Sequence, residues 1–498
     1  MMTTTIEQLM QTSEVKFGTS GARGLVSDMT DQVCYAYTLG FIQYLEKTQQ
    51  LIQQADQTAA IVLAGDLRNS TPDILNACAR AISDSGYQII NAGLIATPAV
   101  ALYGLAHDCP AIMVTGSHIP DDRNGIKFYK LAGEILKEDE LLIKEQVIAL
   151  PAEVFAAQGK FKETKNCLPM LDSTALDEYQ QRFLDLFPGQ ALAGKKIGVY
   201  QHSGVAREML AELLEKLGAE VIKLGYSEQF IPVDTEAVRE EDIELARQWV
   251  SEYHLDAIVS TDGDADRPLI SDEKGQWLRG DIAGFLCAQY LQIDHIVTPV
   301  SSNTCVEKSG FFVDVKRTRI GSPYVIEAMQ HYVEDHYAAV AGYEANGGFL
   351  LGTPVRKNNY LLSALPTRDA IIVLLTLLHS SVEQNLSLSQ LSAQLPQRYT
   401  YSDRIKNFAT EKSQQLITRY TQGTETENKT SIETDFPQFG SINIINTLDG
   451  LRITFANDDI IHFRPSGNAP EFRCYSESDS VEKAQGINNI ALQRIISL

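Results

Sequence analysis

Short apolar runs alternate with stretches of helical periodicity along most of the chain. In the N-terminal part they predict a strand, a helix and two further strands, in this order, at 59–64, 72–85, 87–91 and 111–114. Strands separated by helical patterns are typical of mostly parallel sheets with helices on both faces.

The same rhythm restarts twice. The second set predicts a strand, a helix and two strands at 197–200, 206–217, 220–224 and 256–260. The third predicts a helix, a strand, a helix and a strand at 281–291, 295–300, 323–336 and 338–342. The architecture therefore recurs, although the residues themselves do not repeat.

The C-terminal residues follow a different pattern. They predict a helix at 402–421 and a polar loop at 423–431. Two strands at 451–455 and 460–463, joined by a turn at 457–459, and a terminal helix from Val481 follow. We therefore predict the α/β class. Three related mixed α/β domains are followed by a smaller α+β domain, around a central cleft, with limits at 1–155, 156–277, 278–395 and 396–498.

Composition narrows the choice of partners and compartment. A net charge of −22 and a pI of about 4.9 argue against nucleic acid and anionic membranes as partners. The seven cysteines are scattered without a Cys-x-x-Cys motif, which indicates reduced thiols and a cytoplasmic protein. The first residues lack the basic region of a signal peptide, and the longest apolar stretch, 370–378, is too short to span a bilayer.

Three carboxylates stand at alternate positions directly after a predicted strand, in the sequence DGDADR. Asp262, Asp264 and Asp266 would repel one another unless a hard cation such as Mg²⁺ lies among them. A solvated acidic turn is the simpler alternative, but the strand end favours a site. Two other motifs fit less well. An EF-hand needs glycine at the position of Arg267, and a haloacid-dehalogenase-like Asp-x-Asp-x-Thr motif has threonine at the position of Asp266.

A serine follows another predicted strand, in the sequence TGSHIPDDRNGIK. The turn is expected to hold the Ser117 hydroxyl in the open, beside His118, with Lys127 ten residues later to steady an anion. Taken alone, Ser117 is better explained as an ordinary loop serine. The Gly-x-Ser-x-Gly frame of a hydrolase is absent, and neighbouring side chains diverge, which argues against a Ser–His hydrolase pair. Together with a metal loop, the serine is better explained as a phosphate carrier.

Three further loops carry suitable groups for a phosphorylated sugar. Arg464 and Arg473 flank a small, amide-rich turn that could grip phosphate, or is merely a turn with two surface arginines. The sequence GYEANGG at 342–348 offers a carboxylate and an amide to sugar hydroxyls, or is only a turn. The glycine-rich, basic segment 16–24 offers another anion contact, or is a flexible entry.

Taken in order, these motifs resemble those of the α-D-phosphohexomutase superfamily, the phosphomannomutase/phosphoglucomutase enzymes, over essentially the whole chain. The matching segments are FGTSGARG, TGSHIPDDRNGIK, DGDADR, GYEANGG and RPSGNAPEFRCY. The resemblance implies four domains around a deep cleft, Mg²⁺ as cofactor and a hexose phosphate as substrate. It also implies reversible phosphoryl transfer between C1 and C6 through a hexose 1,6-bisphosphate.

The resemblance also implies a role for each matching residue. Ser117 would be the phosphoserine and would hold the metal with Asp262, Asp264 and Asp266. The other catalytic candidates are Arg23 and Lys127 as general acid or base, Arg267 and His118. The sugar hydroxyls would be held by Glu344 and Asn346, and the phosphate that is not reacting by Arg464, Ser466, Gly467, Asn468 and Arg473.

Some positions depart from the family pattern. Related enzymes commonly have other residues where this chain has Ile119, Asn346, Gly348 and Asn468, and the loop at 319–323 lacks a histidine. GYEANGG and residues 366–369 are most similar to the phosphomannomutase branch. We therefore expect a phosphomannomutase, monomeric or weakly dimeric. Alternatives are a phosphoglucomutase or dual-specificity mutase, a Mg²⁺-dependent sugar-phosphate phosphatase, and a silent sugar-phosphate-binding protein.

Overall fold

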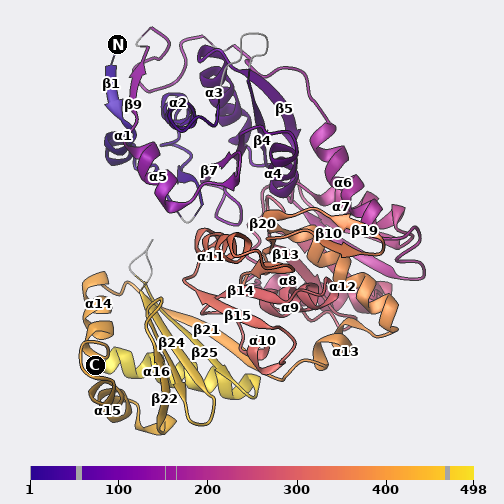
Figure 1. Ribbon diagram of the computed structural model, residues 1–498, viewed down its shortest axis with the longest axis vertical. Coiled ribbons are helices and arrows are strands. Elements are labelled where there is room, and N and C mark those ends of the chain that lie inside the picture. The colour runs from indigo at the N-terminus through magenta and orange to yellow at the C-terminus, as the bar shows by residue number, and fades with distance from the viewer. Residues whose placement is uncertain (1, 19, 52–58, 152, 164, 466–470) are drawn as a thin grey trace.

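The computed structural model describes residues 2–18, 20–51, 59–151, 153–163, 165–465 and 471–498. Its elements form three mixed α/β units and a C-terminal unit built on an antiparallel sheet. In Figure 1 the N-terminal unit lies at the top, the C-terminal unit at the lower left, and the two central units between them. The predicted fold class is confirmed, whereas the predicted domain limits remain a prediction.

The first sheet has the strand order β2-β3-β7-β6-β4-β5. Its strands are β2 (Lys16–Phe17), β3 (Ala22–Leu25), β4 (Ala60–Gly65), β5 (Gln88–Leu94), β6 (Ala111–Val114) and β7 (Arg123–Lys130), with β8 (Gly133–Glu134) paired to β7. The helices α2 (Asp31–Lys47) and α3 (Thr71–Asp84) share a core with Ile61 and Leu63, whereas α4 (Thr97–Ala106) packs with Val62 and Ala64. Because side chains alternate along a strand, helices therefore cover both faces. Outside this sheet lie β1 (Met2–Thr5), α1 (Ile6–Ser13), α5 (Lys137–Lys144) and β9 (Val147–Leu150).

The second and third sheets repeat the plan with fewer strands. The second has the order β11-β10-β12-β13, with β10 (Lys196–His202), β11 (Glu220–Tyr226), β12 (Ala257–Thr261), β13 (Pro268–Ser271) and helices α6 (Thr174–Leu186), α7 (Arg207–Lys216) and α8 (Glu240–Tyr253). The third has the order β15-β14-β16-β17-β20, with β14 (His295–Pro299), β15 (Asp314–Thr318), β16 (Val340–Tyr343), β17 (Phe349–Leu351) and β20 (Leu365–Asp369). The remaining elements of this unit are α9 (Gly280–Tyr290), α10 (Cys305–Lys308), α11 (Ser322–Glu334), β18 (Val355–Lys357), β19 (Tyr360–Leu362), α12 (Ala370–Gln384) and α13 (Leu388–Ala393).

All three sheets place a short polar loop at the same topological point. In each sheet three strands run parallel, and the chain then turns straight back from the last of them into an antiparallel neighbour, at β6–β7, β12–β13 and β16–β17. The expectation of mostly parallel sheets holds for the second sheet but is wrong for the first and third, because these also contain further antiparallel pairs and connections this short cannot hold a crossover helix. These three loops carry Ser117, the Asp262–Asp266 triplet and Glu344.

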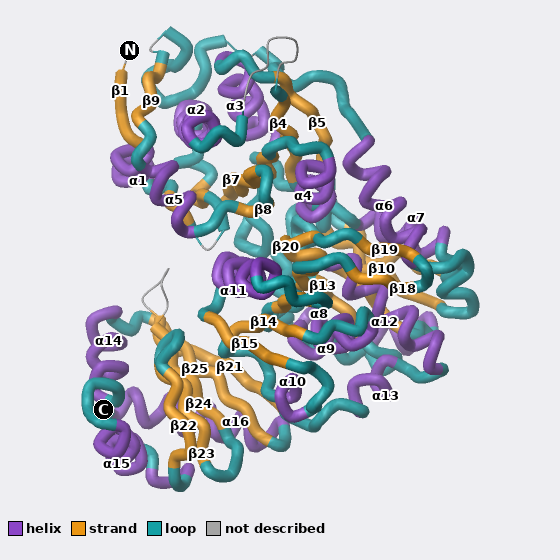
Figure 2. The backbone as a smooth tube through the Cα atoms, in the orientation of Figure 1, coloured by secondary structure: helices purple, strands orange, loops and turns teal. Residues whose placement is uncertain are grey.

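The C-terminal unit is a five-stranded antiparallel sheet in the order β21-β25-β24-β23-β22, shown at the lower left of Figure 2. Its strands are β21 (Tyr399–Lys406), β22 (Ile442–Asn446), β23 (Leu451–Phe455), β24 (Ile460–Pro465) and β25 (Glu471–Ser478), with helices α14 (Thr410–Arg419), α15 (Glu425–Asp435) and α16 (Val481–Ser497) and the short 3₁₀ helix Pro437–Phe439. The predicted strands at 451–455 and 460–463, their turn and the terminal helix are confirmed.

Two predictions for this unit are wrong. The helix expected over 402–421 is split, since Tyr399–Lys406 pairs with β25 along its whole length and only the second half is α14. The polar run 423–431 is not a loop but opens α15, because Thr424 and Glu427 form a reciprocal capping box.

Within the described ranges, no helix is both long and apolar enough to cross a bilayer. All seven cysteines are free thiols.

Candidate active site

A buried arginine, Arg68, binds the backbone of the loop that carries Ser117. Arg68 donates from its guanidinium to the carbonyl oxygens of Ser117 (2.9 Å), Ile119 (2.6 Å) and Pro120 (2.8 Å). Ser117 itself has a left-handed φ of +53°, and its N–H donates to Thr115 Oγ1 at 2.8 Å. Sequence reasoning missed Arg68, although an arginine two residues beyond Asp66 at the end of β4 is a signal of the same kind as the other loops. The side chain of Ile119 still has no structural explanation.

Ser117 lies against the carboxylate triplet. Its hydroxyl donates to Asp262 Oδ2 at 2.6 Å, which joins the loop after β6 to the loop after β12. The residue has no exposed surface, so the expectation that the hydroxyl stands in the open is wrong. The reason is that the metal loop of the second unit closes over the serine, with Gly263 next to its carbonyl oxygen.

Each of the three aspartates is anchored through one or both of its oxygens. Asp262 Oδ1 accepts from the backbone N–H groups of Asp266 and Arg267, both at 3.2 Å. Asp264 Oδ2 accepts from Thr97 Oγ1 at 2.5 Å and from Lys127 Nζ at 2.6 Å. Asp266 Oδ2 also accepts from Lys127 Nζ, at 2.6 Å.

The remaining oxygens fit a metal ion. Among the described residues, the buried Oδ1 atoms of Asp264 and Asp266 have no hydrogen-bond partner. One oxygen from each of the three aspartates can be chosen so that all lie within 4.8 Å of one another. Buried, unpaired carboxylate oxygens are costly without a cation, and oxygen ligands suit Mg²⁺. The donor set therefore fits a divalent metal.

The triplet is electrostatically divided. Burial raises the pKa of Asp262 well above its usual range, and the neighbouring Asp266 and Asp264 raise it further. Burial alone would also raise the pKa of Asp266, but Arg368, Lys127 and Arg267 lower it below its usual range. Three cations thus favour the charged form of Asp266, whereas burial and the two neighbouring carboxylates disfavour the charged form of Asp262.

Arg368, to which the sequence analysis gave no role, connects the predicted metal loop, residues 262–267, to the predicted sugar loop, residues 344–348. Its Nη2 lies 2.8 Å from Asp266 Oδ2 and its Nη1 lies 3.3 Å from Glu344 Oε2. It lies within the segment 366–369 noted in the sequence, immediately before Asp369, which caps α12, but that pattern gave it no role.

The three other catalytic candidates surround this cluster. Arg267 Nε lies 3.6 Å from Asp266 Oδ1 and 3.9 Å from Asp262 Oδ2. Burial, together with Arg267 and Arg368, lowers the pKa of Arg23 to about 10. Burial and the charges of Arg267 and Arg23 lower the pKa of His118 to about 2, so its ring is neutral, with Nδ1 3.4 Å from Ser117 Oγ.

The sugar loop is a tight turn at the end of β16. Glu344 and Asn346 are both buried, at 4% and 7% exposure. Asn346 Oδ1 accepts from the N–H of Gly348 at 2.9 Å, and its backbone oxygen accepts from Thr235 Oγ1 at 2.7 Å. The structure thus brings Glu344 to the metal site through Arg368.

The two arginines of the predicted phosphate loop lie on neighbouring strands of the C-terminal sheet. Arg464 and Arg473 are directly opposite each other on β24 and β25, and Asp449 accepts from Arg464 Nε at 2.9 Å. Like charges opposite each other are destabilising unless an anion lies between them. Neither arginine makes a hydrogen bond or ion pair with the serine or metal loops in the described part of the chain. Ser466, Gly467 and Asn468 lie outside the described residues.

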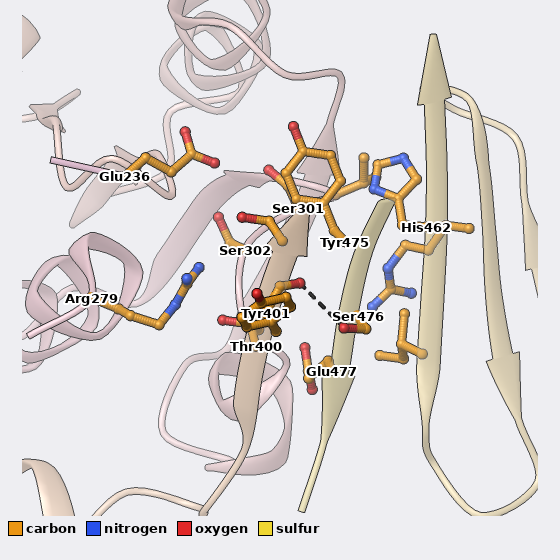
Figure 3. A pocket seen from close by; sticks show the side chains of 14 residues that line it. Glu236, Arg279, Ser301, Ser302, Thr400, Tyr401, His462, Tyr475, Ser476 and Glu477 are labelled. Carbon is orange, nitrogen blue, oxygen red and sulfur yellow. Dashed lines mark hydrogen bonds between the residues drawn. The ribbon is translucent and has the colours of Figure 1, made fainter. Parts of the chain in front are cut away.

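A pocket separates the C-terminal sheet from the central units (Figure 3). Glu236 and Arg279 line one side, and His462 and Tyr475, whose rings stack with centroids 5.4 Å apart, line the other. Burial and the neighbouring Asp234 raise the pKa of Glu236, whereas Arg279 and Arg267 lower it. The pocket therefore lies between the central units and strands β24 and β25 of the C-terminal sheet.

Comparison with known proteins agrees with this arrangement. Models of phosphoglucomutase/phosphomannomutase α/β/α domains I, II and III match residues 14–152, 177–275 and 279–399. The chain therefore belongs to the phosphoglucomutase/phosphomannomutase family, within the α-D-phosphohexomutase superfamily. It is an enzyme of the phosphohexomutase class, as its motifs predict.

The similarity to known relatives covers nearly the whole chain. It is 44% identical to a phosphomannomutase of Salmonella muenchen, over 97% of this chain and 96% of the relative. It is 42% identical to a phosphomannomutase of Sinorhizobium fredii (strain NBRC 101917 / NGR234), over 94% and 96%. The fold is similar to that of the Paramecium exocytosis-sensitive phosphoprotein pp63/parafusin, a phosphoglucomutase, in its open form. That match has a TM-score of 0.70 at 17% identity and covers 96% of this chain and 94% of the other.

Proposed function

We propose that this enzyme is a phosphomannomutase, which interconverts mannose 6-phosphate and mannose 1-phosphate through a phosphorylated Ser117. The observation that carries the proposal is the buried contact between Ser117 Oγ and Asp262 Oδ2, within a carboxylate triplet that fits a metal. Two relatives above 40% identity carry the phosphomannomutase name, which favours mannose over glucose. The free thiols and the acidic charge agree with a cytoplasmic enzyme.

Asp262, Asp264 and Asp266 would hold Mg²⁺ together with an oxygen of the phosphorylated Ser117. Once bound, the ion would supply positive charge to the phosphoryl oxygens. Arg267, 3.6 Å from Asp266, is placed to neutralise charge that develops on the serine oxygen. Glu344 and Asn346 would orient the sugar through its hydroxyls.

The transfer itself exchanges one P–O bond for another. The free hydroxyl of the sugar phosphate attacks the phosphorus on Ser117, and the bond from phosphorus to Ser117 Oγ breaks as the bond to the sugar oxygen forms. The hydroxyl proton passes through a base and ends on Ser117 Oγ, the hydroxyl that here donates to Asp262. The resulting mannose 1,6-bisphosphate turns over and returns its other phosphoryl group to Ser117.

We assign the proton transfer to Arg23 rather than Lys127. Lys127 Nζ is committed to two carboxylates, each at 2.6 Å. Arg23 has a pKa lowered to about 10 by burial and by its cationic neighbours, and its buried Nε has no hydrogen-bond partner among the described residues. An arginine with a lowered pKa is a better proton acceptor than one in water.

The mobile sugar must present each end in turn to Ser117. Arg464 and Arg473 would grip the phosphate that is not reacting, together with Ser466, Gly467 and Asn468. The pocket of Figure 3 lies on the same strands as these arginines, with Glu236 and Arg279 of the central units facing His462 and Tyr475 of the C-terminal sheet.

The test compares mannose 1-phosphate and glucose 1-phosphate side by side, with Mg²⁺ and a hexose 1,6-bisphosphate as activator. We expect a higher kcat/KM on mannose 1-phosphate and no mutase turnover in Ser117→Ala. Full activity in Ser117→Ala would disprove the phosphoserine mechanism. Equal efficiency on both sugars would indicate a dual-specificity mutase, and free phosphate as the main product would indicate a phosphatase.

A further inference from the structure

One planar guanidinium group spans two loops that belong to different units. Arg368 is only 3% exposed, and its two terminal nitrogens lie 2.8 Å from Asp266 Oδ2 and 3.3 Å from Glu344 Oε2. Asp266 belongs to the metal triplet after β12, whereas Glu344 belongs to the sugar loop after β16. The fork of Arg368 therefore sets where these two carboxylates lie relative to each other.

The space for this arginine depends on a glycine in the sugar loop. A Cβ atom added to Gly348 would lie 2.6 Å from Arg368 Cδ and 2.7 Å from Arg368 Cγ. Contacts below 3.0 Å essentially never occur for real Cβ atoms, so any side chain at position 348 would displace the stem of Arg368. Gly348 was one of the departures noted in the sequence, and its close approach to Arg368 provides a reason for it.

The contact also decides which oxygen of Asp266 faces the metal site. Oδ2 accepts from Lys127 and forms an ion pair with Arg368, whereas Oδ1 is left without a hydrogen-bond partner in the described structure. Loss of the arginine would remove one of the two cations that hold Oδ2 and leave Lys127 to orient that oxygen. On the other side of the fork, Glu344 would lose the cation that orients it.

We propose that Arg368 is a positioning residue, which fixes the metal ligand Asp266 relative to the sugar ligand Glu344, and that Gly348 makes this position possible. The proposal rests on the proposed function for the sugar role of Glu344. Buried ion pairs are weak contributors to stability, so a role in geometry accounts better for an arginine placed here. Lysine cannot replace it, because a single ammonium group does not form two diverging contacts in a fixed plane.

Arg368→Lys tests the fork while keeping the charge. We expect direct titration with Mn²⁺, without sugar, to give an affinity lower by about 10-fold or more, as for other groups that orient metal ligands. We expect kcat to fall by about 10²-fold, since a displacement of about 1 Å is costly in a positioned site. The matched control is Arg356→Lys, an exposed arginine on β18 of the same unit, which should change neither value.

Gly348→Ala provides a second, independent route to the same displacement. It should reduce Mn²⁺ affinity and kcat as Arg368→Lys does, whereas Gly486→Ala, where an added Cβ meets nothing within 4 Å, should not. In an Arg368→Ala background, Gly348→Ala should add no further loss, because the side chain it displaces is already gone. Guanidinium ion should restore part of the turnover of Arg368→Ala, and methylammonium should not.

Three results would overturn the proposal: unchanged metal affinity and kcat in Arg368→Lys, full activity in Gly348→Ala, or additive losses in the double variant. A lower unfolding midpoint with unchanged metal affinity would likewise mean that Arg368 is only structural. The metal titration needs no sugar. Failure of the phosphomannomutase assignment would therefore leave this test intact, and failure here would leave that assignment intact.

Discussion

The hydroxyl of Ser117 and the carboxylate of Asp262 meet at 2.6 Å, although the residues are 145 positions apart. Each stands in the short loop that follows the third parallel strand of its sheet. The contact exists because the first two units meet loop to loop, with Thr97 at the start of α4 also bonded to Asp264. A serine hydroxyl and a carboxylate are thereby paired across a boundary between two folded units.

Asp262→Asn should change activity and stability in opposite directions. The substitution removes one of three adjacent buried negative charges, whose repulsion raises the pKa of Asp262. Without metal, the variant should therefore unfold at a higher temperature than the native enzyme. It should lose the stabilisation by saturating Mg²⁺, about 2.7 kcal/mol at 100 times the Kd, and kcat should fall by about 10²-fold or more.

Thermal unfolding in EDTA and in excess Mg²⁺ measures both effects. Asp335→Asn, at an exposed helix end outside the site, is the matched control and should respond to Mg²⁺ like the native enzyme. An Asp262→Asn variant that is still stabilised by Mg²⁺ would exclude Asp262 as a ligand.

Replacing Lys127 by methionine should lower the free energy of unfolding without metal, and Mg²⁺ should recover part of that loss. Lys127 is 1% exposed and compensates Asp264 and Asp266 at once, each at 2.6 Å. Its loss leaves buried carboxylates unpaired, which costs about 3–5 kcal/mol. Urea unfolding in EDTA should reveal this cost, and Mg²⁺ should recover part of it. Lys308→Met removes an exposed pair with Asp458 and should cost less than about 1 kcal/mol. Equal losses in the two variants would contradict this account.

The sequence predicts the loops better than it predicts their contacts. Polar residues directly after an apolar run identify Ser117, the aspartates and Glu344, because a strand end is visible in one dimension. Arg68 and Arg368 also lie at or just beyond strand ends, but nothing local indicates which groups they contact. Their partners lie about 50 residues away in the first case and in another unit in the second. Such residues become recognisable only after the fold has brought the loops together.

Local chemistry also explains the errors in the C-terminal unit. Tyr399–Lys406 has no strong alternation of burial, with most of its residues exposed or half-buried, so the pattern is weak. The strand is specified by its partner β25 instead. Conversely, the capping box of Thr424 and Glu427 was readable, but the polar composition of the helix concealed it.

His202 should make the enzyme less stable in mild acid. Burial lowers its pKa from 6.5 to about 4, and its Nε2 pairs with the carbonyl of Thr261 at 2.9 Å. Between these values the unfolded chain binds a proton and the folded chain does not, so stability falls as the pH falls from 6.5 towards 4. The loss attributable to His202 is at most about 3 kcal/mol. Urea unfolding at pH 7.5 and pH 5 should show a smaller difference for His202→Gln than for the native enzyme. His331→Gln, whose side chain is 61% exposed, should leave the difference unchanged.

Arg464→Ala should weaken substrate binding without affecting the metal site. Arg464 stands opposite Arg473, where two cations favour an anion, and Asp449 fixes its orientation. Because the same grip must hold either end of the sugar, KM should rise by about 10-fold or more for both mannose phosphates. Mn²⁺ affinity should stay at the native value, since no hydrogen bond or ion pair links Arg464 to the metal loop in the described structure. Arg419→Ala, at the exposed end of α14, is the control and should keep the native KM. A rise in KM confined to one of the two substrates would show that Arg464 does not serve both orientations.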